Sequence, residues 1–88
     1  MALGFLDILY FGSFREAFGR DCERVDPPSH VLTVADLIEW LAVQGEPYAS
    51  VFGDRSRVRA AVEGVSAAPG DSVFGAREVA LFPPGGVL

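Results

Sequence analysis

The stretch TVADLIEWLA, residues 33–42, predicts the one long helix around which the rest of the chain folds. Thr33 and Asp36 have the residue types and the spacing of a capping box, in which each side chain accepts a hydrogen bond from the backbone NH of the other residue. Apolar residues then recur at helical spacing, which predicts a face buried against a hydrophobic core. The residues of this face are Val34, Leu37, Ile38 and Leu41. Because Gly45 follows the pattern, we expect the helix to cover residues 33–44.

Two strand-like segments precede this helix and predict a β-hairpin. LDILYF, residues 6–11, is rich in branched and aromatic side chains. Ser13 and Glu16 then have capping-box spacing, which predicts a short helix that Gly19 ends. Residues 21–25 alternate in polarity and predict an edge strand that pairs with the first strand.

Two further strands follow the long helix and complete the sheet. Residues 46–56 contain Pro47 and Gly53, which predicts a loop with a short helical turn. VRAAV and EVALF, residues 58–62 and 78–82, predict the remaining strands. We therefore expect an α+β fold, with a mixed sheet of four to five strands and the main helix packed on one face.

The composition is that of a small acidic domain. A chain of 88 residues forms one hydrophobic core. Its formal charge is -5, with twelve acidic residues against seven arginines and no lysine. This balance disfavours nucleic acid and anionic membranes and favours a partner with a basic face. Because no apolar run approaches the ~18 residues of a membrane span and no signal-peptide pattern opens the chain, we expect a soluble, cytoplasmic protein.

The sequence lacks the residue combinations that form redox, metal-binding or catalytic sites in other proteins. Cys22 is the only cysteine, so we interpret it as a small apolar strand residue. His30 has no second ligand near it in sequence, so we expect no metal site. Arg55, Arg57 and Arg59 alternate at the start of a strand, which favours a solvated edge over a docking patch. With no nucleophile beside a base and no phosphate-binding glycine loop, the chain is not expected to be an enzyme on its own.

The first and last strands offer a candidate partner surface. Alternation places Leu9 and Phe11 on the sheet face that the helix leaves uncovered. Together with Phe82 they would form an exposed apolar patch for a partner. The alternative is that loop residues such as Phe52 fold over them.

The residues quoted above also carry a family likeness. LDILYFGSFREAFG, residues 6–19, resembles the first strand and short helix of the small subunit of molybdopterin synthase. EVALFPP, residues 78–84, resembles the last strand of that family and the start of its tail, and a weaker similarity runs through TVADLIEWLA and VRAAVEG. The resemblance implies a ubiquitin-like β-grasp domain over residues 1–82 and an extended C-terminal tail over residues 83–88.

The resemblance further implies a sulfur carrier whose chain terminus is the reactive group. In that family an ATP-dependent adenylating (E1-like) enzyme activates the C-terminal glycine, which is converted to a thiocarboxylate. The thiocarboxylate enters the large subunit of molybdopterin synthase and gives sulfur to a pterin precursor in molybdenum cofactor biosynthesis. Gly85 and Gly86 would be the reactive residues here, with ATP used by the activating partner and no cofactor bound by this chain. The implied tail prolines and the patch together make up the expected partner-binding residues Phe11, Leu9, Phe82, Pro83 and Pro84.

The end of the sequence departs from this family pattern. The family usually places two residues between the prolines and a terminal glycine pair. Here Gly85 and Gly86 follow Pro84 directly, and Val87 and Leu88 stand where the glycines are expected. Three interpretations remain open: Val87 and Leu88 are removed, the natural end differs, or the carrier function is lost. A carrier for thiazole or another sulfur pathway, and a β-grasp interaction module without sulfur, are the alternative functions.

Overall fold

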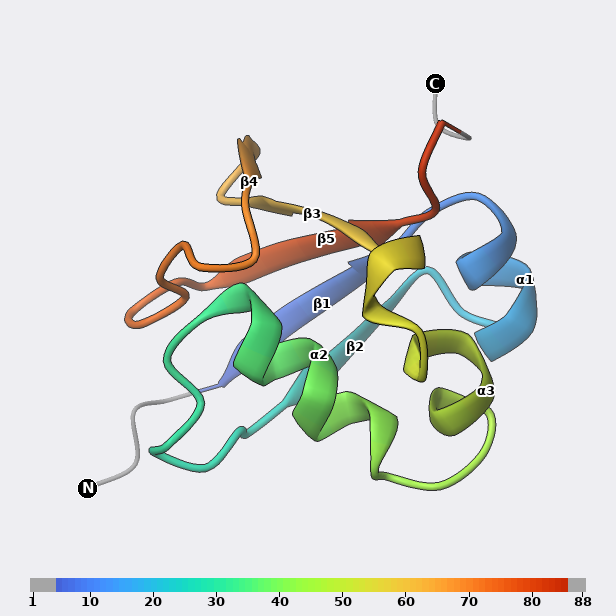
Figure 1. Ribbon diagram of the computed structural model, residues 1–88, viewed down its shortest axis with the longest axis horizontal. Coiled ribbons are helices and arrows are strands. Elements are labelled where there is room, and N and C mark those ends of the chain that lie inside the picture. The colour runs from blue at the N-terminus through green and yellow to red at the C-terminus, as the bar shows by residue number, and fades with distance from the viewer. Residues whose placement is uncertain (1–4, 86–88) are drawn as a thin grey trace.

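The structure, a computed structural model, describes residues 5–85 as a five-stranded mixed sheet with a helix across one face (Figure 1). The strand order is β2-β1-β5-β3-β4, and this arrangement confirms the predicted β-grasp fold. The elements in chain order are β1 (Leu6–Tyr10), α1 (Ser13–Phe18), β2 (Cys22–Val25), α2 (Val34–Ala42), α3 (Tyr48–Phe52), the 3-10 helix η1 (Arg55–Arg57), β3 (Arg59–Val62), β4 (Val65–Ala67) and β5 (Glu78–Phe82).

The first and last strands lie side by side at the centre of the sheet. β1 and β5 run parallel, with Leu9 opposite Ala80 and Tyr10 opposite Leu81. β2 extends the sheet on one side and β3 and β4 on the other, each through antiparallel pairing. Because β5 has a hydrogen-bonded neighbour on both sides, the end of the last strand has a fixed position.

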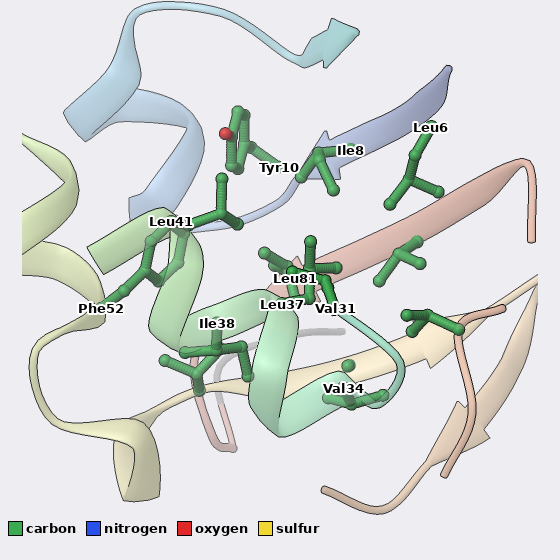
Figure 2. Packing of buried hydrophobic residues seen from close by; sticks show 14 of the residues in the cluster. Leu6, Ile8, Tyr10, Val31, Val34, Leu37, Ile38, Leu41, Phe52 and Leu81 are labelled. Carbon is green, nitrogen blue, oxygen red and sulfur yellow. The ribbon is translucent and has the colours of Figure 1, made fainter. Parts of the chain in front are cut away.

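The helix α2 packs on the sheet in the way the sequence predicts. Its capping box forms: the Thr33 hydroxyl accepts from the NH of Asp36 at 3.1 Å, and the Asp36 carboxylate accepts from the NH of Thr33 at 3.2 Å. The predicted face is buried, with Leu37 fully inaccessible to solvent. Figure 2 shows these side chains in the same buried cluster as Ile8 and Leu81 of the central strands. The helix ends at Ala42, short of the predicted end.

The helix α1 forms without the predicted capping box. Ser13 is its first helical residue, and Gly12 occupies the cap position with a φ of 60°. Gly12 turns the chain directly from β1 into the helix, so Ser13 and Glu16 do not cap it, and no side chain does. The predicted end is confirmed, because Gly19 has a φ of 69° and its NH donates to the carbonyl oxygen of Arg15 at 2.9 Å.

The strand β4 was not among the strands that the sequence predicted. It pairs antiparallel with β3 through a two-residue turn. The turn residues Glu63 and Gly64 both have positive φ, 51° and 83°, which is the backbone of a type I′ hairpin. Three residues are too few to show an alternating pattern, so the sequence carried only the turn signal.

Candidate partner surface and C-terminal tail

The C-terminal segment leaves the sheet from a fixed base. Phe82, the last residue of β5, pairs with Arg59 of β3, and the NH of Phe11 donates to the carbonyl oxygen of Leu81 at 3.1 Å. Pro83 is half-buried, whereas Pro84 and Gly85 are exposed. The tail therefore starts at the end of the molecule where α1 also lies (Figure 1).

The chain turns at Pro84 and Gly85. Gly85 has a φ of 67°, and a proline followed by a residue with positive φ is the combination found in type II turns. A Cβ at Gly85 would meet no atom within 4 Å, so the backbone conformation rather than space favours glycine here. The second predicted reactive residue, Gly86, lies outside the described residues, as do Val87 and Leu88. The path of the whole tail and the roles of Gly85 and Gly86 thus stay predictions.

An apolar patch occupies the sheet face opposite α2. Leu9 and Phe82 are half-buried, and Phe11, just after β1, is 43% exposed. Ala80 pairs with Leu9 on one side and with Ala61 on the other, so both alanines lie on the same sheet face as Leu9. We call Leu9, Phe11, Phe82, Ala80 and Ala61 the outer-face patch. The alternative that Phe52 covers this patch is wrong, because Phe52 is 1% exposed and packs in the core with Tyr10 and Phe14.

Charged side chains border the outer-face patch. Arg24 Nε lies 2.9 Å from Asp7 Oδ1 across the β1–β2 pair. The hydrogen bond from Arg24 is the main reason why the pKa of Asp7 lies below its usual value. Both side chains are well exposed, so the pair adds little to stability. An apolar centre with a polar rim is typical of protein–protein interfaces.

Behind the base of the tail, a carboxylate joins two tyrosines from different elements. Glu23 of β2 accepts hydrogen bonds from the hydroxyls of Tyr10 and Tyr48, each at 2.8 Å to Oε1, and Tyr48 also donates to Oε2 at 2.7 Å. Burial, and then the hydrogen bond to Glu23, raise the pKa of both tyrosine hydroxyls above the usual value. We call these three residues the Glu23 network.

Aromatic rings continue this network into the two short helices. Phe18 of α1 stacks on Tyr10 with a centroid separation of 4.4 Å and contacts Tyr48 at 4.9 Å. Phe14 meets Phe52 of α3 edge to face at 5.5 Å. The sequence did not predict these contacts, because the residues lie far apart in the chain. Their effect is to hold α1 and α3 against the end of the sheet from which the tail leaves.

A groove of about 510 Å³ lies between α1, α3 and the tail prolines. Its apolar lining comes from Phe14 and Ala17 of α1, Val51 of α3, and Pro83 and Pro84. We call it the tail groove. Asp54 and Arg57 also line it, so it combines apolar side chains with both charges.

The three arginines predicted at a strand edge separate into different environments. Arg55 and Arg57 belong to η1 rather than to a strand, and only Arg59 lies in β3. Arg55 forms an ion pair with Glu39 of α2, whereas Arg57 lines the tail groove. Arg59 donates to two backbone carbonyl oxygens at 3.1 and 3.4 Å. All three side chains are exposed, as a solvated edge predicts, but the expected alternation along a strand is wrong because a helical turn precedes β3.

The remaining candidate residues stand apart from the tail base. Cys22 is exposed on β2, and His30 is exposed in the loop before α2. Residues 5–85 contain no cluster of three side chains suited to hold a metal ion. In the same part of the chain, no helix has the length and apolar character needed to cross a membrane.

The fold and the tail define a class of protein: the ubiquitin-like sulfur carriers and modifiers, small β-grasp domains. The sequence profile of the ThiS family matches residues 8–86, so the chain belongs to the ThiS family. The matched region ends at Gly86 and leaves out Val87 and Leu88. The family likeness inferred from the sequence is thereby confirmed.

Solved structures agree with this assignment. SAMP1 from Haloferax volcanii is 30% identical with a TM-score of 0.69, covering 94% of this chain and 98% of that one. A second structure of the H. volcanii small archaeal modifier protein 1 is also 30% identical, with a TM-score of 0.69 and coverage of 92% and 98%. A protein from Pyrococcus furiosus assigned as subunit 1 of a molybdopterin converting factor is 25% identical, with a TM-score of 0.69 and coverage of 91% and 97%. No curated protein is a significant match to the sequence.

Proposed function

We propose that this chain is the small, sulfur-carrying subunit of a molybdopterin synthase and that Gly86 supplies its reactive carboxylate. The observation that carries the proposal is the tail base, where β5 and two prolines lead to an exposed Gly85 outside the sheet, shortly after Phe82 of the outer-face patch. The family match ends at Gly86, which supports that residue as the functional terminus. The P. furiosus relative supports the molybdopterin branch.

The proposed chemistry begins with hydrolysis of the peptide bond between Gly86 and Val87, which leaves a carboxylate on Gly86. In the activating enzyme, one carboxylate oxygen attacks the α-phosphorus of ATP, and pyrophosphate leaves. A hydrosulfide donor then attacks the carbonyl carbon of the acyl adenylate, and AMP leaves with its phosphate oxygen. The product is a thiocarboxylate. The ATP belongs to the activating partner throughout.

The residues of the tail suit this role in a specific way. Without a Cβ, Gly85 and Gly86 let enzyme atoms approach the backbone closely on all sides. Pro83 and Pro84 restrict the backbone just before them, so less conformational freedom is lost when the tail enters a narrow channel. The side chain of Val87 has no place in a channel shaped around bare backbone, which is why we place cleavage before it.

The outer-face patch is the proposed docking surface for the large subunit and for the activating enzyme. A tail of a few small residues offers little apolar area, so affinity has to come from the globular domain. Phe11 and Phe82 are the aromatic side chains of the patch, and aromatic residues often dominate interface energies. The charge of -5 favours partners with a basic surface around that contact.

A second candidate function is that of a protein modifier. It is supported by the similarity to SAMP1, a small archaeal modifier protein. In this alternative, the adenylated carbonyl of Gly86 is attacked by an amine of another protein, and AMP leaves as an amide bond forms. Both functions use the same tail and activation step. They differ in the nucleophile that attacks the carbonyl carbon of the adenylated Gly86. In the sulfur carrier it is a hydrosulfide, and in the modifier it is an amine of another protein.

The experiment that separates them starts from the chain ending at Gly86, loaded as a thiocarboxylate. The thiocarboxylate is mixed with the cognate large subunit and the pterin precursor. In parallel, the unloaded chain ending at Gly86, which still has the carboxylate to be adenylated, is mixed with cell extract, ATP and the activating enzyme. Formation of a sulfur-containing pterin supports the synthase subunit. Covalent protein conjugates without sulfur transfer would favour the modifier, and the absence of both would leave an interaction module as the better account. The Gly85→Ala/Gly86→Ala chain is the control for dependence on the glycine pair.

A further inference from the structure

We propose that the tail groove is a second contact surface for the large subunit. It would receive a projecting segment of that subunit that carries an apolar side chain and, next to it, a carboxylate that Arg57 binds. The proposal rests on the function proposed above, because it adds a second side to the interface around the tail base.

The position of the groove is the first argument. Pro83 and Pro84 are part of its lining, and Pro83 directly follows Phe82 of the outer-face patch. The two surfaces therefore meet at the tail base, one formed by the sheet and the other by α1 and α3. A protein that takes up the tail beyond Pro84 has to surround this base, so its rim meets the groove as well as the patch.

The apolar lining of the groove is the second argument. Ala17 is exposed and Val51 half-buried, and both line the groove with Phe14. Phe14 packs edge to face on Phe52, with ring centroids 5.5 Å apart, which holds α1 against α3. The groove is thus formed before a partner arrives, and binding needs no rearrangement of the domain. An apolar side chain of the partner would remove apolar surface on both molecules from water.

The charges of the groove are the third argument. Asp54 already has partners, because its carboxylate accepts hydrogen bonds from the NH and the hydroxyl of Ser56 at 3.1 and 2.6 Å. The pKa of Asp54 lies below its usual value chiefly because of the Ser56 hydroxyl, and the charge of Arg57 is the last of the causes. Within residues 5–85, Arg57 forms no ion pair with a carboxylate, whereas three other arginines each form one.

An exposed arginine of this kind suits a carboxylate from the partner. The planar guanidinium offers two parallel N–H donors to the two carboxylate oxygens. The chain has a charge of -5, so we expect the large subunit to be basic around most of the interface and acidic at this point. This local reversal of charge would allow only one orientation of the large subunit on the tail base.

The test compares two pairs of variants of the chain ending at Gly86, and the charge changes equally within each pair. Ala17→Glu places a carboxylate in the groove, whereas Ala49→Glu places one on α3 outside it. Arg57→Glu reverses the charge in the groove, whereas Arg77→Glu does so just before β5, at the opposite end of that strand from the tail base. Calorimetry should give a dissociation constant for the cognate large subunit at least about tenfold higher for the two groove variants. The two control variants should bind as the unmodified chain does.

A second measurement reports on the groove itself and needs no variant. When the large subunit is added to the chain ending at Gly86, the NMR signals of the Ala17 and Val51 methyls should shift together with those of Leu9 in the outer-face patch. Circular dichroism melts show whether each variant used for calorimetry is folded. Ala17 and Val51 signals that stay unchanged while those of Leu9 shift, or equal affinities within both pairs of variants, would overturn the proposal.

The failure of this inference differs from the failure of the proposed function. If the groove variants bind as tightly as their controls while Phe11→Ala/Phe82→Ala weakens binding, docking through the outer-face patch stands and this inference falls. If the unmodified chain ending at Gly86 does not bind the large subunit, the proposed function falls, and this inference falls with it.

Discussion

Replacement of Glu23 by alanine should destabilise the domain by about 2–4 kcal/mol, because it removes the acceptor shared by two tyrosines. Tyr10 is 1% exposed and its hydroxyl bonds to Glu23 at 2.8 Å. A buried donor left without a partner costs about 1–3 kcal/mol. Tyr48 is half-buried and can turn to water, so the loss of its bonds adds only about 1 kcal/mol. A domain of this size has roughly 4–13 kcal/mol of total stability, so the effect is large.

Urea unfolding followed by circular dichroism measures this loss directly. Glu39→Ala is the matched control, because Glu39 pairs with Arg55 at the surface and its loss should change stability by no more than about 0.5 kcal/mol. In the Glu23→Ala background, Tyr10→Phe should restore part of the stability, since it removes the unpaired hydroxyl. A loss below about 0.5 kcal/mol for Glu23→Ala, or no recovery in the double variant, would refute the reasoning.

Three further predictions follow from the core, the patch and the tyrosines. Leu37→Ala should lower the free energy of unfolding in denaturant melts by about 2–5 kcal/mol, whereas Leu32→Ala, at a side chain 48% exposed, should lower it by under about 1 kcal/mol. Equal losses would show that the buried face of α2 is not part of the hydrophobic core. Phe11→Ala/Phe82→Ala should weaken binding to the large subunit by about 2 kcal/mol or more while the melting curve still shows a folded domain, and unchanged affinity by calorimetry would remove both residues from the interface. Burial chiefly, and then the hydrogen bond to Glu23, raise the pKa of Tyr10, so the contribution of its protonated hydroxyl to folding stability should be complete below the ordinary tyrosine pKa of about 10 and decline as pH rises above it. Tyr10→Phe should therefore flatten the loss of stability at alkaline pH. A loss equal to that of the unmodified chain would contradict this prediction.

The parts of the fold that depend on local patterns were predictable from the sequence. The capping box at Thr33 and the buried face of α2 follow from spacing within one helix. The position of Leu9 and Phe11 on the sheet face opposite α2 follows from alternation along one strand. Where one residue shifts the pattern, prediction failed: Gly12 took the cap position that Ser13 was expected to fill.

The parts that depend on distant residues were not predictable in this way. Glu23 meets Tyr48 from 25 positions away, and no local pattern marks that pair. The same aromatic packing draws Phe52 into the core rather than over the outer-face patch. The tail groove exists only because α1, α3 and the prolines meet in the folded domain. The glycine pair itself was visible in sequence, but the turn at Gly85 came from the structure.

The most direct test of the central claim is the intact mass of the protein after incubation with a cognate activating enzyme, ATP and a sulfide donor. The chain ending at Gly86 should release pyrophosphate and gain the mass of a carboxylate oxygen replaced by sulfur. The chain with Val87 and Leu88 should gain nothing, nor should the Gly85→Ala/Gly86→Ala form. Equal loading of the untrimmed chain, or no loading of the trimmed chain even with its tail lengthened to that of its relatives, would contradict the account.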